Sequence, residues 1–569
     1  MTKPKNPIPG VVYHPAEVVA RYRALGVLTD ETLGQVLHDA AVRHADKVAV
    51  VGPPDTRWTY RELDERSDRF GAALLDLGLK PLDPVMFQLG NVPEFFVALY
   101  GCFKAGLIPV CTLPAHRDEE IGYIARLVSA KAHIVQGDMK LDLVAFGRKM
   151  AAQVEGMDHL IVARGQPGPD LHSLDALIAR VSAKDARARI EALDIDPYNV
   201  AIYQLSGGTT GLPKVIPRFN SEYVCNVRSW ATASGLSEKT VSLWPLPAIH
   251  NAAMVAFNTP AHFLGGRAVV TQDHDPESFL GTIERERVTL TGAALPVMVR
   301  CIDAGVIGRY DLSSVECFIS LGETPTVHRE FKVPGYHIFG MAEGLCMRTL
   351  PGDPESVRLG CIGRPVNPHD EVKLVKIGTE EPVAVGEVGE FLARGPYTIR
   401  GYFKAEEHNA KTFTADGYYR TGDLMKANVI DGVTYYSFEG RSKDNIDRGA
   451  EKISAEEVER YVLRHPDVRE CMVIGMPDRM MGERVCAYII AEDNRRAPTV
   501  AELADFLTAQ GLARFKSPER IEVVDNFPVT KVGKTSKGLL REDIRRKLAA
   551  EQAGAERAPH KAGGGRPSA

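Results

Sequence analysis

Between Leu33 and Met341 the sequence alternates short apolar runs with longer stretches of helical periodicity. Runs such as VAVVG (48–52), PVMFQLG (84–90) and HIVQG (133–137) have the length and composition of strands buried on both faces. This alternation predicts layered α/β subdomains with largely parallel sheets. Because 569 residues exceed what one hydrophobic core usually serves, we expect at least two domains.

The pattern changes twice further along the chain. From about Glu371 to Tyr436 helices become scarce and short alternating segments dominate, which predicts a β-rich subdomain. After Asp444 the periodicity predicts a small α+β domain, with helices at 454–465 and 500–510 and strands at 470–476, 486–492 and 520–525. We therefore expect three parts: a large N-terminal domain (1–441), a small C-terminal domain (442–547) and a disordered tail rich in Gly, Pro and Ala (548–569).

Charge and cysteine content exclude several classes of function. The 69 basic and 74 acidic side chains nearly balance, so we expect no binding to nucleic acid or to an anionic membrane. The nine cysteines include no C-x-x-C pair and predict reduced, packed thiols. The N-terminus lacks the apolar region of a signal peptide, and no apolar run is long enough to span a bilayer. These features favour a cytoplasmic protein that acts on small molecules.

A glycine-rich loop follows the predicted strand VAIYQL (200–205) and runs from Ser206 to Lys214 as SGGTTGLPK. Closely spaced glycines let backbone N–H groups converge on an anion, and threonine hydroxyls and a lysine add donors and charge. A lone Gly-Gly-x-x-Gly is usually an ordinary turn, but nine consecutive residues of this type predict a phosphate site. The spacing of a P-loop kinase is absent, since its nearest approach, at Gly533-Lys534-Thr535, has Pro528 in place of the first glycine.

Several ordered motifs accompany this loop: FGMAEG (339–344), YRTGD (419–423), GRSKD (440–444) and the segment 528–534. Together they resemble the adenylate-forming superfamily of acyl-CoA synthetases, luciferases and adenylation domains, over essentially the whole chain up to Lys547. The runs KVIPR (214–218), PAIHN (247–251) and RGPYTIRGYFK (394–404) are similar to those of stand-alone aryl-acid AMP ligases, such as 2,3-dihydroxybenzoate and salicylate ligases.

The resemblance implies a reaction in two halves, with ATP and Mg²⁺ as cofactors. A carboxylate attacks the α-phosphate of ATP and expels pyrophosphate, and a thiol then takes the acyl group from the adenylate. Negative charge accumulates around phosphorus in the first transition state, so the site needs preorganised cations and N–H donors.

The resemblance also assigns roles to individual residues. Lys534 would be the mobile catalytic lysine, Lys214 a further catalytic cation, and Lys443 the hinge on which the small domain turns. Glu343 and Thr210 would hold Mg²⁺, and Asp423 would accept hydrogen bonds from the ribose hydroxyls. The remaining nucleotide-binding candidates are Ser206, Gly207, Gly208, Thr209, Gly211, Gly322, Glu323 and Arg441.

The candidate acid pocket departs from the pattern of catechol ligases. The resemblance places Asn251 against the polar groups of the acid, with His250 in support and with Gly340 and Cys346 in the wall. Catechol ligases carry Tyr and Ser where this chain has Ala252 and Ala256. Burying a ring 3-hydroxyl without a partner costs about 1–3 kcal/mol. We therefore predict an acid without a 3-hydroxyl: salicylate-like, anthranilate-like or a bulkier bicyclic acid.

Two further departures lie elsewhere. Gly322-Glu323 stands where this subgroup usually has Gly-Ala near the adenine. Gly449-Ala450 stands where relatives have two glycines beside the pantetheine tunnel, and the extra methyl group either narrows the tunnel or is tolerated.

No carrier domain follows Lys547, so we expect the thiol on a carrier protein supplied in trans. An aryl-CoA ligase and a non-catalytic nucleotide-binding relative are the alternatives. Retention of Lys214, Glu343, Asp423 and Lys534 together argues against the non-catalytic relative, because a protein that only binds nucleotide has no use for the mobile lysine.

Overall fold

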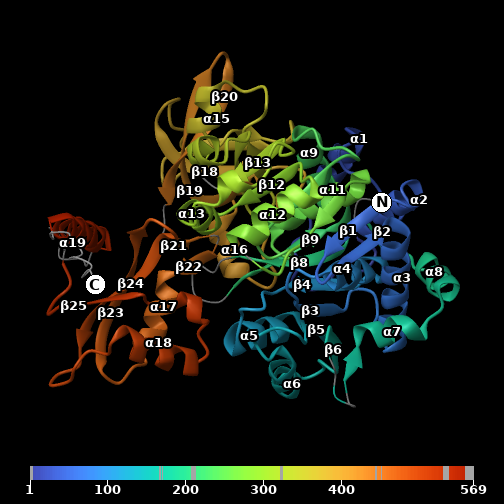
Figure 1. Cartoon of the computed structure of the whole chain (residues 1–569), viewed down its shortest axis with the longest axis horizontal. Coiled ribbons are helices and arrows are strands. Elements are labelled where there is room, and N and C mark those ends of the chain that lie inside the picture. The colour runs from blue at the N-terminus through green and yellow to red at the C-terminus, as the bar shows by residue number, and fades with distance from the viewer. Residues whose placement is uncertain are drawn as a thin grey trace, which may run out of the picture. The chain divides into compact units, whose positions relative to one another are not determined.

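The computed structural model of the chain describes residues 4–165, 168, 171–206, 213–273, 275–320, 324–441, 445–449, 451–528 and 537–557. These residues divide into two compact units, one made of residues up to 206 and 213–441 and the other of residues 445–557. The large unit contains three sheets and the smaller unit one (Figure 1). Each unit has its own buried core.

One sheet of the large unit has seven strands, whose neighbours run parallel except at β8 and β9. Every residue of β3, β4 and β5 is buried, as the continuous apolar runs predict for parallel strands covered on both faces. The strands in spatial order are β7 (His172–Ser173), β6 (His159–Ala163), β5 (Ala132–Gln136), β3 (Pro84–Gln88), β4 (Ile108–Cys111), β8 (Val200–Leu205) and β9 (Val215–Phe219).

A second sheet has nine strands and is parallel from β14 to β1, with antiparallel strands at both edges. Its β14–β15 hairpin carries the FGMAEG motif. The strands in spatial order are β16 (Arg364–Pro365), β15 (Cys346–Arg348), β14 (Gly335–Gly340), β13 (Cys317–Ser320), β12 (Leu290–Ala293), β10 (Val241–Leu243), β11 (Arg267–Val269), β1 (Val48–Gly52) and β2 (Thr56–Thr59).

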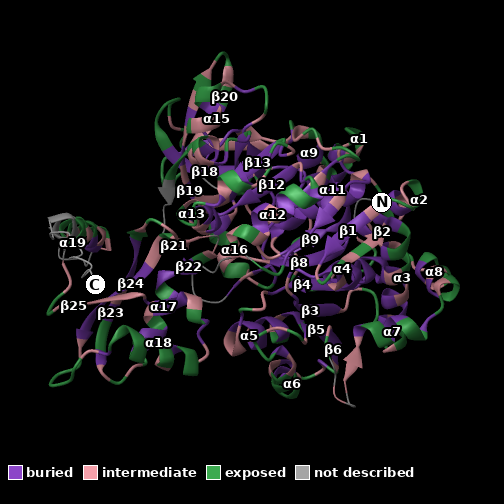
Figure 2. Cartoon of the chain, viewed as in Figure 1, coloured by how far each residue is buried: buried purple, intermediate pink, exposed green. Residues whose placement is uncertain are grey.

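Helices lie between the two sheets and on their outer faces, and the central strands are buried (Figure 2). The middle layer shares one core with both sheets and contains α2 (Leu33–Arg43), α3 (Tyr60–Asp76), α4 (Pro93–Ala105), α9 (Asn220–Ala233) and α11 (Thr259–Leu264). The outer faces are covered by α12 (Pro276–Glu286) and α13 (Leu295–Asp303) on the nine-stranded sheet, and by α5 (Asp118–Val128) and α6 (Leu143–Gln153) on the other. The predicted layered α/β architecture is confirmed.

Shorter helices complete the large unit. They are α1 (Ala16–Ala24), α7 (Leu174–Arg180), α8 (Ala183–Glu191), α10 (Asn251–Ala253), the π-helical turns η1 (Met254–Asn258) and η3 (Val327–Phe331), the 3₁₀ turn η2 (Ile307–Arg309), α14 (Thr324–Thr326), α15 (Glu355–Gly360) and α16 (Glu406–Thr412).

Local signals set the ends of the middle helices. Thr59 and Glu62 form a reciprocal capping box at the start of α3. Pro93 begins α4, and Gly106 ends it with φ of 71°, a left-handed conformation that glycine adopts without strain. Because α4 is apolar on nearly every side, it is stable only between the two sheets.

The β-rich part of the large unit is a four-stranded antiparallel sheet, as the sequence predicts. Its core includes Leu345 and Met347, so it packs directly on the β14–β15 hairpin. This packing brings the YRTGD motif toward FGMAEG. The strands are β17 (Glu371–Val375), β18 (Val388–Arg394), β19 (Tyr419–Ile430) and β20 (Val433–Arg441).

The smaller unit is α+β, and its sheet has helices on both faces. The helix α19 continues past Lys547 to Arg557, and residues 558–569 lie outside the described residues. None of the described helices is long and apolar enough to cross a membrane. The strands are β22 (Glu451–Ser454), β21 (Asn445–Arg448), β24 (Gly482–Ala491), β23 (Val468–Asp478) and β25 (Arg520–Val523), and the helices are α17 (Ala455–Val462), α18 (Val500–Ala509), η4 (Arg514–Lys516) and α19 (Lys537–Arg557).

Candidate active site

The two ends of the glycine-rich loop are hydrogen-bonded to each other where β8 and β9 separate. The Ser206 N–H donates to the Lys214 carbonyl oxygen at 3.0 Å, and the Lys214 N–H donates to the Ser206 hydroxyl at 3.3 Å. Antiparallel pairing of β8 with β9 thus closes the loop as a hairpin. Its central residues, including Gly207, Gly208, Thr209, Thr210 and Gly211, lie outside the described residues.

The turn between β14 and β15 presents Glu343 and is tied down through its backbone. The Ile399 N–H donates to the Glu343 carbonyl oxygen at 2.9 Å. Gly344 has φ of 135°, and a Cβ at this position would lie 2.0 Å from the carbonyl oxygen of Tyr397. Only glycine therefore fits the close approach of this turn to the segment at 397–399.

Two buried tyrosines hold the Glu343 carboxylate. The Tyr402 hydroxyl donates to Glu343 Oε1 at 2.6 Å, and the Tyr402 and Tyr419 hydroxyl oxygens lie 2.9 Å apart. The pKa of both tyrosines is raised well above the usual value, mainly by burial and further by the charge of Glu343. Both hydroxyls therefore remain protonated donors. Lys214 Nζ lies 5.9 Å from the centroid of the Tyr402 ring. The Tyr402 side chain therefore contacts two predicted site residues.

Arg218 lies near the end of β9, and its side chain is fully buried. Its guanidinium group donates hydrogen bonds to several neighbours. Its guanidinium pairs with both carboxylate oxygens of Glu222, at 2.8 and 2.9 Å. It also donates to Asn226 Oδ1 at 3.1 Å and to the carbonyl oxygens of Ala342 at 2.7 Å and Tyr397 at 3.4 Å. Arg218 thus fixes the residue before Glu343 and the segment against which this turn packs.

Asn251 lies where the acid pocket was predicted, at the start of α10, and is 8% exposed. Its Oδ1 accepts a hydrogen bond from the Tyr223 hydroxyl at 3.0 Å, and its Nδ2 lies 3.5 Å from the Met341 carbonyl oxygen. Because the tyrosine hydroxyl fixes which end of the amide accepts, the amide N–H₂ is turned toward the β14–β15 hairpin. Asn251 is thereby joined to the turn that carries Glu343.

The other predicted pocket residues are grouped around this hairpin and α10. Gly340 and Cys346 face each other across the hairpin; Gly340 is exposed, and a Cβ added there would lie 3.6 Å from Cys346 Sγ. Ala252 is half-buried, whereas Ala256 is 1% exposed within the π-helical turn that follows. Ala252 is therefore the more accessible of the two small residues.

Cys346, a candidate for the pocket wall, has a polar neighbour. Asn226 Nδ2 lies 3.7 Å from Cys346 Sγ, within reach of a weak hydrogen bond to sulfur. Burial raises the pKa of the thiol to about 11, so it stays neutral at physiological pH.

His250 supports the pocket through the backbone. Its Nδ1 accepts a hydrogen bond from the Ala252 N–H at 3.2 Å and so caps α10. Burial lowers the pKa of the imidazole below its usual value, so the ring is neutral and able to accept this bond.

The predicted ribose-binding residues lie on adjacent strands. Asp423 on β19 is 3% exposed and is paired in register with Arg441 on β20. The Asp423 N–H donates to the Thr421 hydroxyl at 3.0 Å. Tyr419, four residues earlier on the same strand, reaches Glu343 through Tyr402. Asp423 and Glu343 therefore belong to one side of the large unit.

The remaining predicted residues belong to the smaller unit or lie outside the described residues. Gly449, in the smaller unit, has φ of 68° and donates its N–H to the Met481 carbonyl oxygen at 2.6 Å. Gly322, Glu323, Lys443, Ala450 and Lys534 lie outside the described residues.

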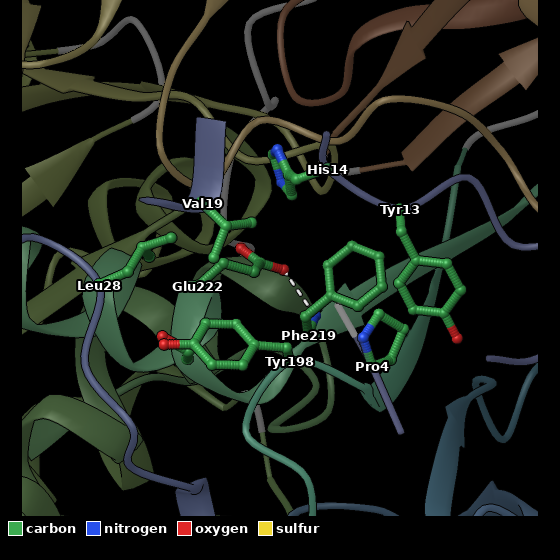
Figure 3. Close-up of a pocket in the computed structure, with 9 residues that line it drawn as sticks. Pro4, Tyr13, His14, Val19, Leu28, Tyr198, Phe219 and Glu222 are labelled. Atoms are coloured by element: carbon green, nitrogen blue, oxygen red, sulfur yellow. Dashed lines mark hydrogen bonds between the residues drawn. The ribbon is translucent and has the colours of Figure 1, made fainter. Parts of the chain in front are cut away.

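A small cavity lies next to Glu222, and none of the candidate acid-pocket residues lines it (Figure 3). Its volume is about 20 Å³, and Figure 3 shows the Glu222 carboxylate accepting the Phe219 N–H at its wall. A cavity needs about 10–15 Å³ for one water molecule, so this one has room for a water but not for an aryl acid. It is lined by Pro4, Tyr13, His14, Val19, Leu28, Tyr198, Phe219, Ser221 and Glu222.

Tyr402, Tyr419 and Arg218 lie next to the candidate site, and the sequence does not single them out, although each stands inside a quoted motif. Their importance lies in contacts between distant segments: Tyr402 and Glu343 are 59 residues apart, and Arg218 and Ala342 are 124 apart. Such pairings leave no local pattern in the sequence.

The chain is similar to known proteins over nearly its whole length. The family AMP-binding enzyme matches residues 37–403, and the family AMP-binding enzyme C-terminal domain matches residues 457–534. The 2,3-dihydroxybenzoate-AMP ligase of Bacillus subtilis is 39% identical over 548 residues, which cover 94% of this chain and 98% of the relative. The salicylyl-CoA synthase / salicylate adenylyltransferase of a Streptomyces species is 40% identical over 548 residues, which cover 95% and 98%.

Among solved structures, the apo structure of Mycobacterium smegmatis MbtA has a TM-score of 0.71 and 32% sequence identity, and the match covers 94% of this chain and 98% of that one. The chain therefore belongs to the AMP-binding enzymes of the adenylate-forming superfamily and, within them, to the aryl-acid AMP ligases. The resemblance found in the sequence motifs is confirmed, and with it the use of ATP.

Proposed function

We propose that this enzyme adenylates an aryl carboxylic acid without a 3-hydroxyl, using ATP and Mg²⁺, and then transfers the acyl group to the phosphopantetheine thiol of a carrier protein in trans. One observation carries the proposal. The turn of the β14–β15 hairpin carries Glu343, which is bonded to Tyr402 near Lys214. The same hairpin pairs Gly340 with Cys346 and is joined to Asn251 through the Met341 carbonyl oxygen. A single turn thus joins groups suited to phosphate and metal with groups suited to an acid.

The residues present are suited to a magnesium ion. Mg²⁺ is usually held by one or two carboxylates together with substrate phosphates and water. Glu343 is a buried carboxylate whose Oε1 is already engaged by Tyr402, which limits its rotation. When bound with ATP, the ion would neutralise charge on the phosphates. Glu343 would hold it, with Thr210 as a further candidate.

Two lysines of the protein would also stabilise the negative charge that develops on the phosphates in the transition state. Lys214 stands at the end of the phosphate-loop candidate, and the resemblance assigns Lys534 to the reacting carboxylate and the α-phosphate. Preorganised donors of this kind stabilise a transition state without reorganising during the reaction. Asn251 would orient the acid, because its N–H₂ is fixed toward the hairpin by Tyr223.

The relatives compared are named for 2,3-dihydroxybenzoate and salicylate. In this chain no hydroxyl is supplied at positions 252 and 256, where both residues are alanine. The half-buried Ala252 also leaves more room than a tyrosine would. We therefore place the substrate among salicylate, anthranilate and bicyclic aryl acids.

Trapping of the adenylate with hydroxylamine tests the substrate class. Benzoate, salicylate, 2,3-dihydroxybenzoate, anthranilate and bicyclic aryl acids are compared at equal concentration. We expect the highest kcat/KM for an acid without a 3-hydroxyl, and Asn251→Ala should raise the KM for that acid while sparing the KM for ATP. Highest kcat/KM for 2,3-dihydroxybenzoate would contradict the pocket argument.

The acceptor is tested separately, because one relative is named a salicylyl-CoA synthase as well as an adenylyltransferase. The enzyme is given the preferred acid with either CoA or a phosphopantetheinylated carrier protein. We expect faster acyl transfer to the carrier protein. Equal or faster transfer to CoA would favour the aryl-CoA ligase.

The nine cysteines are all free and buried, which suits the reducing cytoplasm that we propose as the compartment. Fractionation of the producing cells, with the enzyme found in the membrane pellet or outside the cell, would contradict this assignment.

A further inference from the structure

We propose that Tyr402 is a positioning residue that sets the Glu343 carboxylate for the metal-bound nucleotide and couples it to Lys214. This inference rests on the proposed function of the same site. It extends that function by naming a residue whose hydroxyl controls how strongly Mg²⁺ strengthens nucleotide binding.

The first argument is the geometry around the carboxylate. A hydrogen bond of 2.6 Å from a hydroxyl to a carboxylate is in the range of charge-assisted bonds. This hydrogen bond occupies Glu343 Oε1 and fixes the direction in which the other lone pairs of the carboxylate point. Tyr419 holds the Tyr402 hydroxyl in turn, at 2.9 Å, so the orientation of the donor is also restrained.

The second argument is that the Tyr402 side chain is held by surroundings that are independent of Glu343. The Asn409 side chain accepts from the Tyr402 N–H at 2.8 Å and donates to the Tyr402 carbonyl oxygen at 2.9 Å. The ring lies 6.3 Å from that of Phe413 and 5.1 Å from that of His408. With its backbone and ring fixed in this way, the hydroxyl is preorganised, and Glu343 need not be bound to metal to be held in place.

The third argument is the contact with the phosphate-loop lysine. Lys214 Nζ lies within the distance of a cation–π interaction with the Tyr402 ring, at 5.9 Å from its centroid. One side chain thus touches a cation through its ring and an anion through its hydroxyl. The two functions are separable, since Tyr402→Phe removes only the hydroxyl and Tyr402→Leu removes both.

Calorimetric titration with α,β-methylene-ATP tests the inference without turnover. The measured quantity is the ratio of the nucleotide Kd in EDTA to the nucleotide Kd in saturating Mg²⁺. Loss of a hydrogen bond to a charged group typically costs enough to change an equilibrium about tenfold. We therefore expect this ratio to fall about tenfold in Tyr402→Phe and to a smaller extent in Tyr419→Phe.

Tyr435→Phe is the matched control. Tyr435 is also buried, lies in the same unit, and donates to a carboxylate, Asp353 Oδ1, at 3.0 Å. This control should lose stability without any change in the Mg²⁺ ratio. In Tyr402→Leu we expect, in addition, weaker nucleotide binding in EDTA, because Lys214 loses the ring.

An unchanged Mg²⁺ ratio in Tyr402→Phe overturns the inference, as does an equal fall in Tyr435→Phe. If Tyr402→Phe does not fold, an unchanged ratio in Tyr419→Phe has the same meaning. Wild-type enzyme that binds the nucleotide and shows the Mg²⁺ effect, but adenylates no aryl acid, would refute the proposed function alone. Wild-type enzyme that binds no nucleotide would refute both.

Discussion

The buried ion pair of Arg218 and Glu222 is an interaction whose loss should strongly destabilise the large unit. Replacing Arg218 by Met leaves the Glu222 carboxylate in an apolar interior and removes the donors that serve Asn226 and two backbone carbonyl groups. Breaking a buried ion pair from one side costs about 3–5 kcal/mol. We expect Arg218→Met to lower the free energy of unfolding of this unit by about 4 kcal/mol.

The helix α9, which carries Glu222, supplies a control. Arg228 pairs with Glu31 at the surface, where its side chain is 45% exposed. Exposed pairs contribute about 0–1 kcal/mol, so Arg228→Met should have little effect. Neutralising both partners in Arg218→Met/Glu222→Gln should recover about 2 kcal/mol, because no buried charge is then left unpaired.

Urea unfolding followed by tryptophan fluorescence measures these differences. All three tryptophans, Trp58, Trp230 and Trp244, belong to the large unit, so the signal reports that unit alone. A loss below 1 kcal/mol in Arg218→Met would refute the reasoning. So would a double variant that is no more stable than Arg218→Met.

Four further outcomes follow from the structure. Gly344→Ala should abolish acid-dependent pyrophosphate exchange in a folded protein, because its Cβ would lie 2.0 Å from the Tyr397 carbonyl oxygen; normal exchange would contradict this. Burial raises the pKa of Asp370 from 3.8 to about 8, so the protonated carboxyl stabilises the folded state at low pH and this stabilisation is lost as the pH rises from 3.8 to about 8. Between pH 5 and 9 the urea midpoint of Asp370→Asn should therefore fall less than that of the wild type. Lys534→Ala should abolish adenylation and spare acyl transfer from a presynthesised adenylate; equal loss of both half-reactions would contradict the division of labour. If the Ala450 methyl group narrows the thiol tunnel, Ala450→Gly should speed single-turnover loading of the carrier; an unchanged, fast rate would show that the methyl group is tolerated.

The strands of the large unit were predictable because buried parallel strands leave a local signal, a continuous apolar run. The runs at 84–90 and 133–137 correspond to β3 and β5. Glu343 was predictable from a contiguous motif. The tyrosine that holds it was not, because the bond from Tyr402 depends on how the segment after β18 packs against the β14–β15 hairpin.

The end of the small domain is less well marked in the sequence. The sequence predicts this end at Lys547, whereas α19 continues to Arg557 through a segment rich in alanine and glutamate, which are strong helix formers.

Acid-dependent exchange of labelled pyrophosphate into ATP tests the central claim most directly. The account predicts exchange well above the acid-free background with at least one aryl acid lacking a 3-hydroxyl, and its loss when Glu343 is replaced by Gln. Exchange that stays at background with every aryl acid would contradict the account.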